Sequence, residues 1–141
     1  MTKEEKDLLL KDLCARLSYG VKISVQSWDE EEQEYVDKVD VLYSVNRDEY
    51  IKSTNEDYDF SLEDIKPYLL PLSNMTEEQK EEFNARTFEI MFGELVCKKN
   101  DEMGYGKIME FDLDFYNKHH LDWRGLIPKG LAINATGLNI Y

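Results

Sequence analysis

The sequence contains few of the residues that mark several large protein classes. It has two cysteines, three prolines and seven glycines in 141 residues, and no apolar run approaches the roughly 20 residues of a membrane span. Two cysteines are too few for a disulfide-based secreted domain, so we expect Cys14 and Cys97 to be free thiols. The first residues mix charges with apolar side chains and do not resemble a signal peptide. We therefore expect a cytoplasmic protein with no membrane partner.

Basic residues are also in deficit. Seventeen lysines and arginines face thirty aspartates and glutamates, which gives a formal net charge of −13. A field of this sign repels phosphate backbones, so we expect no direct binding to DNA or RNA. Hydrophobic residues still make up 42 % of the chain, which is enough for the core of one domain over residues 1–141.

The signatures of common catalytic sites are missing from the sequence. There is no GxSxG elbow, no glycine-rich phosphate loop and no CxxC pair. Gly104-Tyr105-Gly106 lacks both the preceding strand and the third glycine of a dinucleotide fingerprint. The sequence therefore predicts a non-catalytic protein without a cofactor.

The first half of the chain predicts a helix followed by an antiparallel meander. Thr2 and Glu5 form a capping box that opens a helix within residues 1–20, with Leu10, Leu13, Cys14 and Leu17 on one face. From Val21 the apolar period changes to two, and turn residues separate four short alternating stretches. A meander over residues 21–72, with a helical turn capped by Ser61, has the layout of a small SH3-like barrel. The expected fold class is α+β.

The second half predicts helices and short strands over residues 73–141. Pro67 and Pro71 favour a braced linker between the barrel and the next helix, and a recognition surface is the alternative. Thr76 and Gln79 form a capping box for a helix that extends toward residue 97, either continuous or broken near Asn84. Further along, the pattern predicts an edge strand at 107–111, a helix at 112–120 and a strand at 130–135.

An acidic run is the most concentrated chemistry in the sequence. A solvated hairpin loop is one interpretation of this run, which consists of Asp29, Glu30, Glu31, Glu32, Gln33 and Glu34. The alternative is a carboxylate face that imitates phosphates and occupies a basic channel. That face would add Asp37, Asp40, Asp48, Glu49, Glu56, Asp57 and Asp59. Four tyrosines lie among these acids, and we expect several of them in the barrel core: Tyr35, Tyr43, Tyr50 and Tyr58.

Two further candidate sites lie near the end of the chain. His119, His120 and Asp122 have the residue types of a metal site, but adjacent histidines on a helix diverge by about 100°. We therefore favour a helix end and predict no metal. Trp123 and Arg124 are common interface anchors, and the alternative is a packed tryptophan with an acid-paired arginine that locks the last segment to the barrel.

Three stretches of the chain resemble a group of short proteins found in gut bacteria and in their phages and integrated mobile elements. The stretches are KDLLLKDLCARLSYGVK at 6–22, IKPYLLPLSNMTEEQ at 65–79 and NKHHLDWRGLIPKGLAI at 117–133, in the same order and approximate spacing. This group has no established activity that could be carried over. The resemblance implies a small cytoplasmic protein that belongs to a mobile element.

These observations predict a non-catalytic acidic protein-binding module whose partner is a protein. Its predicted contact residues are Asp29, Glu30, Glu31, Glu32, Glu34, Trp123 and Arg124. One alternative is a nucleic-acid mimic that inhibits a basic DNA- or RNA-binding defence enzyme. A second alternative is a metal-dependent enzyme that uses the histidine cluster. The oligomeric state is not predicted by any feature of the sequence.

Overall fold

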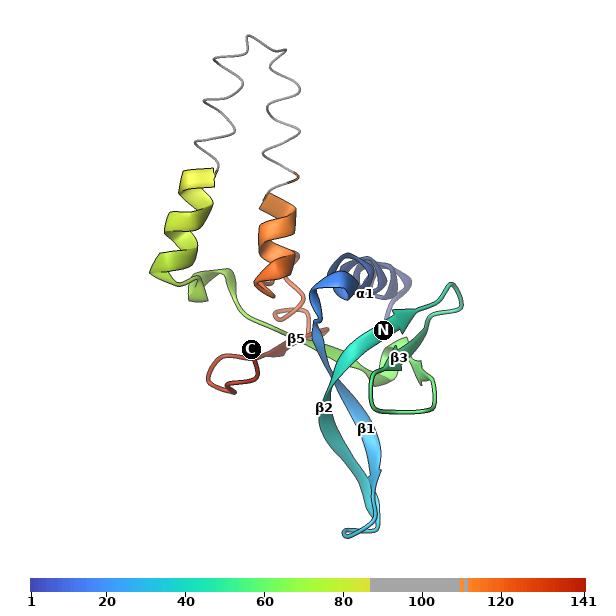
Figure 1. The fold of residues 1–141 in the computed structure, drawn as a ribbon. Helices are drawn as coiled ribbons and strands as arrows, with labels where there is room; N and C mark the ends of the chain where they lie inside the picture. The colour runs from blue at the N-terminus through green and yellow to red at the C-terminus, as the bar shows by residue number, and fades with distance from the viewer. Residues whose placement is uncertain (87–109, 111) are drawn as a thin grey trace.

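A six-stranded, mostly antiparallel open sheet organises the fold in the computed structural model, which describes residues 1–86, 110 and 112–141 (Figure 1). The strands run in the order β4-β3-β2-β1-β5-β6. In chain order the elements are α1 (Lys3–Arg16), η1 (Leu17–Tyr19), β1 (Lys22–Asp29), β2 (Glu34–Val45), β3 (Tyr50–Ser53), β4 (Phe60–Ser61), η2 (Leu62–Asp64), β5 (Lys66–Leu69), η3 (Leu72–Asn74) and β6 (Ile133–Asn134). Residues 77–86 and 112–118 are also helical. The predicted α+β class is confirmed.

The predicted capping box begins α1, but the buried face of this helix differs from the predicted one. The side chains of Thr2 and Glu5 each accept a hydrogen bond from the backbone N–H of the other residue. The buried positions are Leu9, Asp12, Leu13 and Arg16, and Cys14 is an exposed free thiol. Apolar periodicity alone missed this face because Asp12 and Arg16 neutralise each other and so occupy two buried positions.

The predicted meander is present, with a long hairpin at its centre. Strand β1 pairs with β2 over its full length, from Lys22 opposite Val41 to Asp29 opposite Glu34. Strand β2 continues into β3 and β3 into β4, each in antiparallel pairing. On the other side, β5 pairs with β1 and β6 runs parallel to β5. The predicted strand at 130–135 is therefore shortened to β6.

The linker predicted around Pro67 is wrong, because residues 66–69 form strand β5 inside the sheet. Pro67 lies opposite Ile23 in the pairing of β5 with β1. The Val21 carbonyl accepts a hydrogen bond from the Leu42 N–H of β2, and Ile23, two residues further along, directs its backbone groups to the same side as Val21. The backbone groups of Ile23 thus face β2. The missing N–H of Pro67 therefore removes no hydrogen bond between β1 and β5.

The four tyrosines of the meander lie outside the core, contrary to expectation. Tyr43 is 68 % exposed and Tyr35 64 %, and Tyr50 and Tyr58 are also exposed. Strand β2 instead buries Leu42 and Asp40. The Asp40 carboxylate accepts hydrogen bonds from the Val41 and Asn55 backbone N–H groups and from the Asn55 amide. Burial opposes ionisation, but these bonds and the nearby Ser53 side chain lower the pKa of Asp40, so the charge is satisfied inside.

The sheet is open in the described residues, and closure into an SH3-like barrel stays a prediction. The Tyr58 hydroxyl, in the connection into β4, donates to the Gln26 carbonyl of β1 at 2.7 Å. Thr54 and Asn55, at the start of the same connection, bond to Val41 and Asp40 of β2, so this connection passes from β2 toward β1 before β4 begins. In the described residues no strand pairing joins β4 to β5 or β6.

Part of the predicted second half lies outside the described residues. The helix that begins at 77 passes through Asn84 without a break and is described to residue 86. Its predicted extension to residue 97 falls in the part that is not described. The same holds for the predicted edge strand at 107–111, except that residue 110 is helical.

Candidate functional site

The acidic run forms the tip of the β1–β2 hairpin. Asp29 ends β1, Glu34 begins β2, and residues 30–33 form the turn between them. The Asp29 carboxylate accepts hydrogen bonds from the backbone N–H groups of Glu31 and Glu32 and so shapes the turn. The carboxylates of residues 30–32 and 34 are exposed, and the hairpin points away from α1 (Figure 1). The acidic run therefore forms a hairpin loop, as the sequence predicted.

An exposed aromatic pair lies directly behind this tip. Trp28 and Tyr35 are opposite each other in the register, and their rings meet edge to face with centroids 5.2 Å apart. Trp28 is 42 % exposed and Tyr35 64 % exposed. Sequence reasoning did not select Trp28, although its position next to the acidic run was a usable signal.

The wider carboxylate face that the sequence suggested is not assembled as predicted. Asp40 is buried and hydrogen-bonded, so it does not belong to a surface. Asp37 is exposed in β2, and Asp59 pairs with Lys52 of β3 at 3.8 Å. The predicted face therefore loses Asp40, and the run of consecutive exposed acids lies at the hairpin tip.

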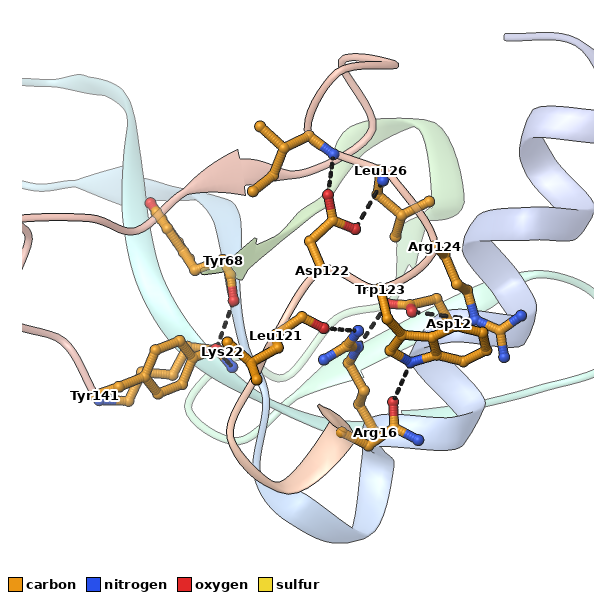
Figure 2. Close-up of polar contacts among 12 residues, drawn as sticks. Asp12, Arg16, Lys22, Tyr68, Leu121, Asp122, Trp123, Arg124, Leu126 and Tyr141 are labelled. Carbon is orange, nitrogen blue, oxygen red and sulfur yellow. Dashed lines mark hydrogen bonds and ion pairs between the residues drawn. The ribbon is translucent and has the colours of Figure 1, made fainter. Parts of the chain in front are cut away.

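Trp123 and Arg124 are half-buried and lie beside Asp12 of α1 (Figure 2). The Arg124 guanidinium stacks on the Trp123 ring at 4.1 Å, and its Nε lies 3.3 Å from Oδ1 of the buried Asp12. The Trp123 indole N–H donates to Asn117 at 3.1 Å. The pair thus attaches the last segment of the chain to α1, whereas the sequence suggested an attachment to the barrel.

Asp12 and Arg16 form the centre of this cluster, and sequence reasoning missed both. The Arg16 Nε donates to Asp12 at 2.8 Å, and its Nη2 donates to the Leu121 carbonyl at 2.6 Å. Both side chains are fully buried. Burial raises the pKa of the Asp12 carboxyl, and the guanidinium groups of Arg16 and Arg124 oppose that effect. The spacing of four residues on a helix was the available signal.

The structure does not bring the three candidate metal ligands together. His119 contacts the Gln79 amide at 3.1 Å, whereas the His120 ring stacks on Tyr141 with centroids 3.8 Å apart. Both carboxylate oxygens of Asp122 accept backbone hydrogen bonds, from Leu126 at 2.8 Å and Ile127 at 2.9 Å. Among the described residues there is no group of three or more His, Cys, Asp or Glu side chains placed to hold a metal ion.

Tyr141 links two strands of the sheet (Figure 2). Its hydroxyl accepts from the Lys22 backbone N–H at 2.9 Å and donates to the Tyr68 carbonyl at 2.7 Å. Burial raises the pKa of Tyr141 to about 12. For His120, burial and then the nearby Arg16 charge lower the pKa to about 4. These contacts attach the last residue of the chain to β1 and β5.

Comparisons of the chain with protein-family models, with curated proteins and with solved structures found no match. The resemblance to short proteins of gut bacteria and their mobile elements stays a prediction. In the described residues, no helix has the length and apolar character needed to cross a membrane.

Proposed function

We propose that this protein is a non-catalytic, cytoplasmic protein-binding module whose binding site is the end of the β1–β2 hairpin. We call this site the hairpin surface and define it by Trp28, Glu30, Glu31, Glu32 and Tyr35. Trp123 and Arg124 are left out of the site because their contacts are internal.

The observation that carries this proposal is the exposed Trp28–Tyr35 pair beside exposed carboxylates. Tryptophan and tyrosine are enriched at protein interfaces because they offer a large, stiff contact area with a polar end. In this chain the two rings contact each other but leave much of their surface in solvent. The adjacent acids complement a basic partner and speed its approach.

A pull-down with the tagged chain tests the proposal, using nuclease-treated lysate at low salt and at about 0.5 M salt. One variant combines Trp28→Ala with Tyr35→Ala, and a second combines E30Q, E31Q and E32Q. The control D7N/E78Q/E81Q removes the same number of charges from exposed helical positions. We expect both hairpin variants to lose the partner and the control to retain it. Equal capture by all four proteins would refute the hairpin surface as the site.

The nucleic-acid mimic is our second proposed function, and the exposure of consecutive carboxylates at the hairpin tip favours it. A mimic acts through charge, so the E30Q/E31Q/E32Q variant should lose a basic partner while W28A/Y35A retains it. The partner should also be released at about 0.5 M salt because screening weakens exposed charge pairs. The sequence resemblance implies that the protein belongs to a mobile element, and such an origin fits a role against host defence.

We further propose that the meander curls into an SH3-like barrel. The order of β1 to β5, with η2 between β4 and β5, and the Tyr58–Gln26 hydrogen bond support it. An experimental structure in which the β4 end packs away from β1 would refute the barrel.

A further inference from the structure

The hairpin carries a stretch of strand edge that is unpaired in the described part of the chain. Strand β1 pairs with β2 along the whole hairpin, but β3 pairs with β2 only at Leu42, Ser44 and Val45. The next contacts on that side are from the Thr54 backbone N–H and hydroxyl to the Val41 carbonyl. From there to the tip, the outer edge of β2 has no strand beside it among the described residues.

The backbone groups along this edge can be assigned from one hydrogen bond. Leu42 N–H donates to the Val21 carbonyl, so even-numbered residues of β2 in this stretch face β1. The N–H and C=O groups of Tyr35, Asp37 and Val39 therefore point outward. These three residues form an edge of about 13 Å, which is long enough for an added strand of five or six residues.

The other edges are less suitable for strand addition. The outer strands β4 and β6 are only two residues long. On the outer edge of β1 beyond β5, the Gln26 carbonyl already accepts from the Tyr58 hydroxyl. The edge at 35–39 is therefore the longest unpaired edge in the part of the chain that the structure describes.

The side chains along the edge select a basic, partly apolar occupant. Tyr35 and Val39 are 64 % and 45 % exposed and lie on the same face as exposed Asp37. Lys38 and Glu34 are on the opposite face, and Glu34 lies at the tip end of the edge, where it adds a carboxylate. Charges on an edge normally prevent pairing, and the net charge of −13 repels a second copy of this chain. The same charges attract a segment that carries lysine or arginine.

We propose that the outer edge of β2 at 35–39 binds an extended, basic segment of a partner protein as an additional strand. Main-chain hydrogen bonds to Tyr35, Asp37 and Val39 hold the segment, and its apolar side chains pack on the Tyr35 and Val39 side. Its basic side chains lie near Asp37 and Glu34. This inference rests on the proposed function and names the backbone edge through which it acts.

The test uses displayed random peptides of about 10 residues, selected on the full chain at about 0.15 M salt. Asp37→Pro removes an outward N–H and blocks the edge, whereas Asp37→Ala removes only the carboxylate. A proline is tolerated at an edge position whose N–H faces solvent. We expect the selection to yield basic peptides. Their affinity for D37A should be within about fivefold of their affinity for the wild type, and their affinity for D37P should be at least tenfold weaker than for D37A. Equal binding to the two variants would overturn the strand addition.

Hydrogen exchange of the wild-type chain provides a second measurement that does not depend on the folding of D37P. A bound peptide should slow exchange at residues 35, 37 and 39, while the amides of 36 and 38 already face β1. Peptide binding that leaves those three amides unchanged would overturn the inference, and so would a selection without any basic peptide. If the pull-down still captures a partner through Trp28 and Tyr35, the proposed function survives that failure.

Discussion

Substitution of Asp12 by alanine should destabilise the fold strongly. The change removes the carboxylate that pairs with Arg16 at 2.8 Å and with Arg124 at 3.3 Å. Arg16 is fully buried, and its Nη1 already has no hydrogen-bond partner in the described residues. Removing one partner of a buried ion pair costs about 3–5 kcal/mol because the remaining charge is left without compensation.

The size of the effect can be converted into a melting temperature. With an unfolding entropy of about 2.1 cal/mol/K per residue, 141 residues give about 0.3 kcal/mol/K. A loss of about 3–5 kcal/mol then lowers the Tm by about 10–17 °C, out of a total stability of about 5–15 kcal/mol. Urea titration followed by circular dichroism gives the same free energy independently through the midpoint.

Two further variants serve as controls for the Asp12→Ala substitution. Asp7→Ala changes an exposed residue of the same helix and should cost less than about 0.5 kcal/mol. The double variant Asp12→Leu with Arg16→Met removes both buried charges, and it should be more stable than Asp12→Ala alone despite its additional change. If Asp12→Ala and Asp7→Ala have the same midpoint, the buried ion pair does not hold α1 in place and the reasoning fails.

Three further predictions concern the last segment of the chain and the hairpin. The folded pKa of His120 is about 4, below its ordinary 6.5, so its contribution to stability is complete above pH 6.5 and is lost as the pH falls toward 4. The partial exposure of His120 reduces this loss to about 1–2 kcal/mol. Asparagine tolerates the positive φ of 59° at this position, so His120→Asn should remove this fall in stability from urea titrations made at a series of pH values. Tyr141→Phe leaves the Lys22 N–H and Tyr68 carbonyl without their shared partner and should cost about 1–3 kcal/mol by thermal denaturation, whereas unchanged stability would contradict the bridging role. The W28A/Y35A variant should unfold within about 1 kcal/mol of the wild type, because both rings are exposed, and a larger loss would assign them to the fold instead of to binding.

Local features of the sequence determined the elements and their ends. The Thr2–Glu5 capping box sets the start of α1 because both hydrogen bonds connect residues three apart. The change of apolar period after Gly20, with its φ of 66°, separates the helix from β1, and the acidic run becomes a hairpin turn through bonds to Asp29. These signals need no distant partner, so the sequence is sufficient to predict them.

Only the tertiary structure decided which faces are buried and which residues meet. Asp40 is inside because Asn55, fifteen residues away, satisfies its carboxylate. Side chains alternate between the two faces of a strand, so Tyr35 and Tyr43 point to the opposite face from Asp40, toward solvent. Arg124 meets Asp12, and Arg16 meets the Leu121 carbonyl 105 residues later, so a residue that the sequence suggested for binding supports the core. Alternation in a strand defines two faces, and only the elements packed against the sheet determine which one is covered.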